Sequence, residues 1–196
     1  MPKLLYQGHG SYRLTADDGR VIYVDPYAGD GYDLPADLIL VTHQHRDHNQ
    51  IHLCERKSTC KVITNEEALA GKKHNNFDVD GISIEAVEAK NMMHNPKKCV
   101  GYIIILEGIS IYASGDTSKT KQMETFADRK LDYAIFPGDG KFNMGLKEAA
   151  ECATLVGAKH NIIVHLKPGK LFDRKKADEW DAPNKMIVEP GQEIAL

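Results

Sequence analysis

Cysteine is scarce in this sequence and follows neither a disulfide nor a metal-binding pattern. Only Cys54, Cys60, Cys99 and Cys152 occur among 196 residues, and no two of them form a Cys-x-x-Cys pair. In a chain without a secretory leader, such cysteines are expected to remain free thiols. We therefore expect all four to pack as ordinary small side chains, and none of them to be a metal ligand.

Long hydrophobic runs are also missing. No apolar stretch approaches the roughly 18 residues that span a bilayer, and the beginning of the chain contains no secretory hydrophobic region. These absences predict a soluble, cytoplasmic protein with no membrane span. The formal net charge of -3 lacks the basic excess of a general nucleic-acid binder, so we expect no nucleic-acid partner.

Internal repeats, low-complexity tracts and long Ser/Gly linkers are absent as well. A chain of 196 residues is long enough for one domain with a well-developed core. We therefore predict that residues 1–196 form a single domain. The sequence leaves open whether the chain forms a homo-oligomer.

The chain does contain a histidine-rich stretch, Thr-His-Gln-His-Arg-Asp-His at positions 42–48. Within it, His43, His45, Asp47 and His48 form a His-x-His-x-Asp-His motif. Imidazole and carboxylate are the ligands that a borderline divalent ion such as zinc takes, and clustered His/Asp tracts usually bind metal. A polar surface loop that happens to be rich in histidine is the alternative. The motif predicts a metal site.

The motif directly follows a short, nearly continuous apolar run at residues 36–41. Such a run predicts a strand that is buried on both faces. At a strand end, residues two apart point the same way, so His43 and His45 can bind one ion together. Asp47 and His48 lie past the turn and can face a second ion. We expect His52, four residues after His48, to be structural or exposed.

Alternating strand and helix patterns continue along the chain. The strand candidates are residues 4–7, 11–15, 21–24, 36–41, 61–64, 82–87, 100–106, 109–113, 131–136, 161–165, 186–189 and 193–196. The helix candidates are residues 65–71, 118–129, 146–156 and 173–180. We expect Asn65 to cap the first of these helices and Gly71 to end it, and Gly157 to end the third.

Metal-ligand residue types recur at the ends of the predicted strands. Asp25 follows residues 21–24, the 43–48 cluster follows residues 36–41, Asp116 follows residues 109–113, and His165 ends residues 161–165. Ligand sites in α/β proteins favour this edge, because several strand ends meet there and the sheet holds them rigid. Four such places in one chain predict a shared site.

The sequence resembles the metallo-β-lactamase-fold hydrolase superfamily over nearly its whole length. The resemblance rests on the 42–48 motif, on His94 before residues 101–104, on Ser-Gly-Asp-Thr at 114–117 and on Ile-Val-His at 163–165. Three shorter features resemble a compact branch of the superfamily: Gly-His-Gly-Ser at 8–11, Asp-Pro at 25–26, and Phe-Asn-Met at 142–144 followed by Glu-Ala at 148–149. That branch includes ascorbate-6-phosphate lactonase-like proteins and relatives of the N-acylphosphatidylethanolamine phospholipase D.

The resemblance implies an α/β fold in which two mixed β-sheets pack face to face with helices outside, a four-layer αββα sandwich. It also implies two divalent metal ions, with zinc as the first choice and manganese or iron as alternatives. The implied ligands form two sets and one bridge: His43, His45 and His94 for one ion, Asp47, His48 and His165 for the other, and Asp116 between the two ions.

Such a site implies a hydrolase of a small ester, lactone or phosphodiester. Two ions that share a hydroxide make it a nucleophile near neutral pH and also polarise the scissile group. Asp47 is the predicted catalytic residue, which would receive or relay a proton. Four lysines flank the predicted site loops and would favour an anionic substrate, unless they are simply solvated: Lys97, Lys98, Lys141 and Lys167.

The roles of two residues and the reaction class remain open. Asp25 either fixes a ligand imidazole from behind or caps the turn before Pro26. His9 either contacts the site or packs structurally. His45 stands where flavodiiron oxidoreductases of this superfamily carry Glu, which favours hydrolysis over redox chemistry. A metal-binding protein without turnover, used for sensing or assembly, is the alternative, although the complete set of seven implied ligands argues against it.

Overall fold

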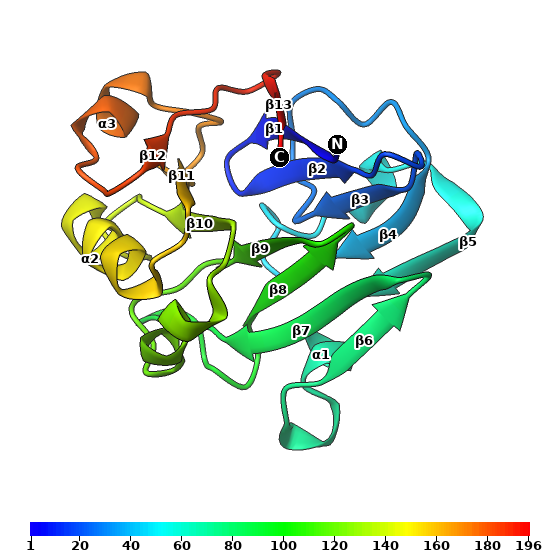
Figure 1. Cartoon of the computed structure of the whole chain (residues 1–196), viewed down its shortest axis with the longest axis horizontal. Coiled ribbons are helices and arrows are strands. Elements are labelled where there is room, and N and C mark those ends of the chain that lie inside the picture. The colour runs from blue at the N-terminus through cyan, green and yellow to red at the C-terminus, as the bar shows by residue number, and fades with distance from the viewer.

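Two β-sheets form the centre of the computed structural model, which describes residues 1–196 (Figure 1). The first sheet contains, in spatial order, β13 (Glu193–Ala195), β1 (Lys3–Gly8), β2 (Ser11–Thr15), β3 (Val21–Val24), β4 (Ala36–Leu40) and β5 (Arg56–Ile63). The second contains β12 (Lys185–Met186), β11 (His160–Val164), β10 (Tyr133–Pro137), β9 (Ile109–Ala113), β8 (Val100–Leu106), β7 (Ile82–Glu88) and β6 (Asn76–Val79). Both sheets are mixed, as predicted.

The helical elements are short and lie outside the sheets. The α-helices are α1 (Asn65–Ala68), α2 (Leu146–Val156) and α3 (Arg174–Glu179). The 3-10 helices are η1 (Ile51–Leu53), η2 (Ala70–Lys72), η3 (Gln122–Thr125) and η4 (Ala127–Arg129). None of these helices combines the length and the apolar character that crossing a bilayer requires.

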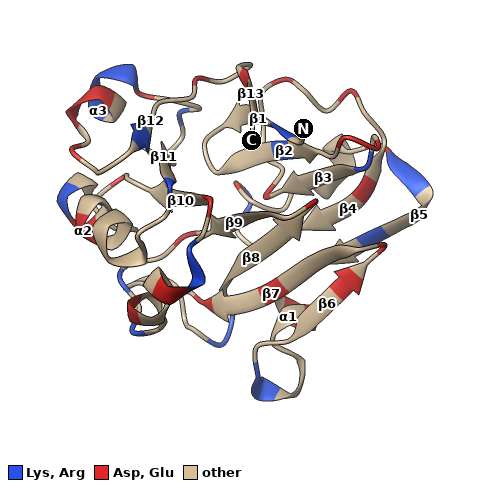
Figure 2. Cartoon of the chain, in the orientation of Figure 1, with Lys and Arg blue, Asp and Glu red and all other residues tan.

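Alternating side chains along the strands fill the space between the two sheets. In β8, Tyr102 and Ile104 point into this central core, while Ile103 points to the outer face of the second sheet. Leu14 on β2 joins the same core from the first sheet. Figure 2 shows charged residues mainly on helices, loops and strand ends, with both signs interspersed. The face-to-face packing of the two sheets confirms the predicted αββα sandwich.

The outer faces of the sheets are covered in different ways. On the second sheet, Tyr112 and Phe136 pack with Cys152 of α2 and with Trp180, which follows α3. On the first sheet, Tyr23, Ile39 and Val41 form a smaller cluster with Cys54, packed against residues of the loop after β3 and of η1. All four cysteines are free thiols, as expected.

Two predicted helices differ from the observed ones. Residues 118–129 form η3 and η4 rather than one α-helix. Met123 and Phe126, three residues apart, are both buried, and this spacing suits a 3-10 turn. Helix α1 is capped by Thr64 rather than by Asn65, and it ends at Ala68, before Gly71.

Several predicted strand boundaries also differ. Strand β5 extends over Arg56–Ile63 rather than residues 61–64, and the residues of β6 were not predicted as a strand. The predicted strand at 186–189 is reduced to Lys185–Met186. These differences occur in the edge strands β5, β6 and β12, whose exposed residues give only a weak hydrophobic pattern.

The direction of the strands brings the predicted ligand residues to the same edge of the molecule. Strands β1, β3 and β4 run the same way, because β2 is antiparallel to both β1 and β3, and β4 is parallel to β3. In the second sheet, β7, β9, β10 and β11 also share one direction. The carboxyl ends of these strands carry the loops that contain the predicted ligands.

Candidate metal centre

The histidine motif begins as soon as β4 leaves the sheet. The N–H of Val41 still donates to Ile63 of β5, and the N–H of Thr42 donates to the Asp25 carboxylate at 2.7 Å. The N–H of His48 then donates to the carbonyl of His45 at 3.0 Å, which closes a tight turn. The motif is therefore held at its start by the sheet and at its end by its own turn.

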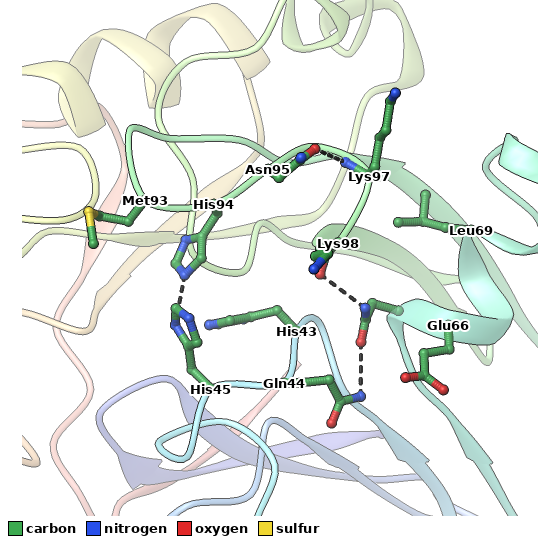
Figure 3. A pocket seen from close by; sticks show the side chains of 11 residues that line it. His43, Gln44, His45, Glu66, Leu69, Met93, His94, Asn95, Lys97 and Lys98 are labelled. Carbon is green, nitrogen blue, oxygen red and sulfur yellow. Dashed lines mark hydrogen bonds between the residues drawn. The ribbon is translucent and has the colours of Figure 1, made fainter.

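The first group of predicted ligands consists of His43, His45 and His94, whose ligand atoms lie within 4.8 Å of one another. Nε2 of His94 is 2.8 Å from Nδ1 of His45. The ring centroids of His43 and His94 are 4.4 Å apart. Figure 3 shows the three imidazoles facing one another, with His94 supplied by the loop between β7 and β8.

The second group consists of Asp47, His48 and His165, together with His9. Oδ2 of Asp47 lies 3.7 Å from Nε2 of His165 and 4.0 Å from Nε2 of His48. His165 comes from the end of β11, so this group joins residues of both sheets. The structure thus gathers the two predicted ligand sets into two adjacent clusters.

Asp116 lies between the two clusters. Its carboxylate is 3.4 Å from Nε2 of His48 and 3.4 Å from Nε2 of His165, and 3.9 Å from Nε2 of His43. The residue is buried, and it follows β9 as the sequence predicted. One carboxylate therefore approaches imidazoles of both clusters.

Several imidazole nitrogens at this centre have no hydrogen-bond partner although they are buried. They are Nε2 of His43, Nε2 of His48 and both ring nitrogens of His165. A buried polar atom without a partner is costly and calls for an explanation. The three Nε2 atoms, directed toward the Asp116 carboxylate, form the nitrogen and oxygen donor set that binds zinc, manganese or iron. The residues present therefore fit a divalent cation.

The charges of the cluster compensate one another. Burial lowers the pKa of His43 to about 2, helped by the charge of neighbouring His48. Burial also acts to lower the pKa of His165, but Asp116 and Asp139 outweigh it and raise the value to about 9. Burial acts to raise the pKa of Asp116, but His48 and His165 hold it well below its usual range. Positive charge is thus favoured on His165, beside the two carboxylates, and disfavoured on His43.

Asp25 lies directly behind a predicted ligand. Its Oδ2 accepts from Nδ1 of His48 at 2.8 Å and from the hydroxyl of Thr42 at 2.6 Å. Of the two roles that the sequence left open, the structure therefore shows the one behind a ligand imidazole. Such a contact fixes the tautomer and orientation of a metal-binding ring.

His9 is fully buried and contacts the second cluster. Its Nε2 lies 2.9 Å from Oδ2 of Asp47, and its Nδ1 lies 3.0 Å from the carbonyl of Lys170. Its ring also packs against that of His165, with 3.7 Å between centroids. His9 is therefore both packed and in contact with the site, and it positions the Asp47 carboxylate.

Three of the eight non-glycine residues with positive φ angles lie at this centre. His9, Asp25 and His165 adopt positive φ angles of 57°, 46° and 48°. The left-handed region is unfavourable for residues other than glycine, and such residues persist where the surrounding structure enforces them, often at functional sites. All three residues touch one another or a predicted ligand.

Three contributors to the centre were not predicted as site residues. Oδ2 of Asp139 lies 3.2 Å from Nδ1 of His165, and Nδ2 of Asn91 lies 2.7 Å from Nδ1 of His94. Asn143 joins them, because it donates to Asp139 and accepts from Asn91. Asp139 carries the same sequence signal as the other strand-end residues, since it follows β10. Both asparagines lie in loops: Asn143 falls within the Phe-Asn-Met stretch of the branch resemblance, which assigned it no role, and no pattern in the sequence identifies Asn91.

Two cavities open onto the predicted ligands. A cavity of about 660 Å³ is lined by His43, Gln44, His45, Asn65, Glu66, Leu69, Met93, His94, Asn95, Lys97 and Lys98 (Figure 3). A second, of about 270 Å³, is lined by His45, Asp47, Met93, His94, Asp116, Phe142, His165 and Pro168. By contrast, His52, His74 and His160 are exposed and lie outside both cavities.

Comparison with known proteins identifies the family of the chain. The family model for the beta-lactamase superfamily domain matches residues 3–165. A UPF0173 metal-dependent hydrolase from Thermococcus onnurineus is 29% identical over an alignment 226 positions long, which covers 100% of both chains. The narrower resemblance to ascorbate-6-phosphate lactonase-like proteins stays a prediction.

Solved structures give the same result. A protein from Parabacteroides distasonis that bears the name metal-dependent hydrolase is 29% identical, with a TM-score of 0.76, and the match covers 95% of this chain and 92% of that one. The metallo hydrolase Igni18 from Ignicoccus hospitalis has the same fold, with a TM-score of 0.79 at 21% identity, over 98% and 97% of the two chains. The chain belongs to the metallo-β-lactamase superfamily and is a metal-dependent hydrolase with a His/Asp metal-binding cluster.

Proposed function

We propose that the chain is a two-ion hydrolase. In this proposal the two ions are held by separate ligand sets that share one bridging residue: His43, His45 and His94 for one ion, Asp47, His48 and His165 for the other, and Asp116 between them. The observation that carries the proposal is the set of buried Nε2 atoms without partners, on His43, His48 and His165, which converge on the Asp116 carboxylate. Zinc is the first candidate, and manganese and iron suit the same donors.

Bound ions would supply Lewis-acid polarisation of the scissile group and a water of lowered pKa. Side chains of the protein would carry out the remaining part of the reaction, the transfer of a proton. Asp47 is the ligand carboxylate most open to the smaller cavity, since its side chain is 36% exposed whereas that of Asp116 is 7% exposed. Asp47 is therefore placed to receive a proton or pass one to the leaving group, while His9 holds one of its oxygens.

The larger cavity suggests the substrate class. Lys97 and Lys98 line it together with the His43, His45 and His94 imidazoles, and neither ammonium group has a carboxylate within 4 Å. We propose that they bind the anionic part of a small ester, lactone or phosphodiester while its scissile bond lies at the imidazoles. Glu66 lines the same cavity and gives it one negative charge against these two positive ones.

Metal analysis and hydrolysis assays test the reaction. The purified protein should contain zinc, manganese or iron and should hydrolyse at least one member of a panel of lactones, esters and phosphodiesters. His45→Ala should abolish that activity, whereas His52→Ala, which changes an exposed histidine near the motif, should retain it. Full activity of His45→Ala, or of the wild type after exhaustive chelation, would contradict the proposal.

The substrate charge is tested separately. Replacing Lys97 and Lys98 together by Gln should raise KM for an anionic ester and leave KM for its neutral analogue unchanged, because only the anion loses its partner. Lys175→Gln, at a side chain that is 88% exposed on α3, is the matched control. An equal rise in KM for both esters would show that the lysines do not recognise charge.

A further inference from the structure

The two ligand clusters differ in the groups that lie next to the outer ring nitrogens of their histidines. We call His43, His45 and His94 the His94 half-site, and Asp47, His48 and His165 the His165 half-site. In the His165 half-site, the outer nitrogens of both histidines face buried carboxylates. Nδ1 of His48 forms a hydrogen bond of 2.8 Å with Asp25, whereas Nδ1 of His165 lies 3.2 Å from Asp139 in an ion-pair contact without hydrogen-bond geometry. A carboxylate behind a ligand histidine strengthens metal binding.

In the His94 half-site, the outer nitrogens of His43 and His94 form no hydrogen bond with a carboxylate, although Asp25 lies within 4.8 Å of His43. Nδ1 of His43 meets the hydroxyl oxygen of Thr42 at 3.0 Å, and that hydroxyl donates to Asp25, so its oxygen remains free to accept. His43 is therefore supported only by a neutral acceptor. Nδ1 of His94 faces Nδ2 of Asn91 at 2.7 Å, and an amide NH₂ group can only donate.

The orientation of the Asn91 amide is fixed by its other contacts. Its Oδ1 accepts from the backbone N–H groups of Met93 and His94 at 2.8 and 2.7 Å. Its Nδ2 donates to Oδ1 of Asn143 at 2.5 Å, and Asn143 is held in turn by a bond of 2.7 Å from its Nδ2 to Asp139. Turning the amide over would break the three bonds that Asn91 makes to Met93, His94 and Asn143, so the NH₂ group stays toward His94.

This arrangement favours the tautomer of His94 that cannot bind an ion through Nε2. A neutral imidazole that accepts at Nδ1 carries its hydrogen on Nε2. In His94 that Nε2 is the atom that faces Nδ1 of His45 at 2.8 Å. The ring therefore presents an N–H group, rather than a lone pair, to the position where an ion would bind, and Asn91 holds it in that state.

We infer that the two half-sites are unequal, and that Asn91 is the residue that weakens one of them. The His165 half-site binds the first ion tightly. The His94 half-site binds the second ion weakly, because His94 becomes a ligand only when its contact with Asn91 is given up. The inference rests on the proposed two-ion site and concerns the order of loading. Asn91 acts through His94 and is a positioning residue.

Metal titration of the metal-free protein tests the order of loading. Cobalt(II) or zinc titration followed by calorimetry should show two steps, at least tenfold apart in Kd, since outer partners of this kind change metal affinity about 10- to 100-fold. His94→Ala should delete the weaker step, and His165→Ala the tighter one. Two steps of equal affinity, or loss of the tighter step in His94→Ala, would overturn the inference.

Substitution of Asn91 tests the cause. Asn91→Asp keeps an oxygen for the two backbone N–H groups and places a carboxylate oxygen at Nδ1 of His94. It should tighten the weaker step about tenfold or more and leave the tighter step within twofold. Asn91→Ala, which removes the NH₂ donor without adding charge, should tighten the weaker step by less. An unchanged or weakened second step in both variants would refute the role of Asn91.

Asn95→Asp is the matched control for added charge. Asn95 lies on the same loop and lines the larger cavity, but its Oδ1 accepts from the N–H of Lys97 and its side chain touches no ligand imidazole (Figure 3). Both steps should keep their affinity in Asn95→Asp; a tightening equal to that of Asn91→Asp would mean that charge alone is responsible. Titration requires no turnover, so an inactive substrate panel would overturn the hydrolase proposal and leave the loading order intact.

Discussion

At the scale of single residues, Gly10 shows how closely the backbone approaches the metal centre. A Cβ atom on Gly10 would lie 2.8 Å from Cε1 of His48, well inside van der Waals contact. His48 has little room to yield, because it is buried and held by Asp25. Glycine at this position therefore allows the His48 ring to occupy its place in the cluster.

We expect Gly10→Ala to displace His48 and to lower the metal affinity of the His165 half-site at least tenfold, in line with the effect of misplacing a ligand's support. The metal retained after dialysis, measured by plasma mass spectrometry, checks this. Gly145→Ala is the control, because Gly145 also lacks a positive φ angle, at -81°, and the nearest atom to its Cβ position is 3.6 Å away. Equal metal retention in both variants would show that the contact is harmless.

The sequence identifies candidate site residues at strand ends, Asp25 behind His48 among them, but it misses supporting residues that lie within loops. Asp116 and His165 were predicted because each follows or ends an apolar strand, and the structure places both in the cluster. Asn91 and Asn143 carry no such signal. Their importance comes from the direction of an amide group, which depends on loop conformation rather than on residue spacing.

At the scale of elements, the short helix α1 forms one wall of the larger cavity and depends on its cap. The Thr64 side chain accepts from the N–H of Glu66, and the Glu67 carboxylate accepts from the N–H and hydroxyl of Thr64. This capping box compensates for the small number of hydrogen bonds that a helix of one turn can form. It holds Glu66 and Leu69 at the cavity.

We expect Thr64→Ala to lower the free energy of unfolding by about 1 kcal/mol at pH 7, the usual cost of losing a cap. Burial acts to raise the pKa of Glu67, but its bonds from Thr64 outweigh this and lower it. The stabilisation is therefore present above the unfolded pKa of Glu67, about 4.3, and is lost as the pH falls through its lower folded value. The difference between wild type and variant should accordingly shrink in acid.

Urea unfolding of the metal-free proteins at pH 7, 5 and 3 measures this difference. Thr154→Ala is the matched control, because Thr154 bonds within α2 to the carbonyl of Ala150 and caps nothing. Its loss should change stability little at any of these pH values. A Thr64→Ala effect that stays constant down to pH 3 would show that the Glu67 carboxylate contributes nothing to the cap.

At the scale of the whole molecule, the αββα arrangement is accessible from the sequence only through its resemblance to a known superfamily. The apolar pattern of residues 100–106 and 109–113, split by Glu107 and Gly108, predicts two strands and their hairpin, and β8 and β9 have these bounds. It does not predict that β10 pairs with β9 and β11 in parallel, because such pairing depends on crossover connections. The His-x-His-x-Asp-His motif, through the superfamily that it resembles, predicts the overall arrangement of the sheets, which periodicity does not.

The metal centre also joins the two sheets. Residues 43–48 follow β4 of the first sheet, while Asp116 and His165 follow β9 and β11 of the second. An ion held by both groups binds only the folded chain, in which these loops meet. Ligands that bind the folded state alone stabilise it by mass action, by about 4 kcal/mol at a thousandfold excess over Kd.

We therefore expect chelation to lower the melting temperature by roughly 8–16 °C, since about 1 kcal/mol corresponds to roughly 2–4 °C in a chain of this size. Calorimetry of the loaded and metal-free proteins checks this. Asp116→Asn, which weakens the carboxylate shared by both clusters, should abolish most of the metal-dependent rise, whereas His52→Ala should retain it. A wild-type melting temperature that does not respond to chelation would mean that the ion does not hold the two sheets together.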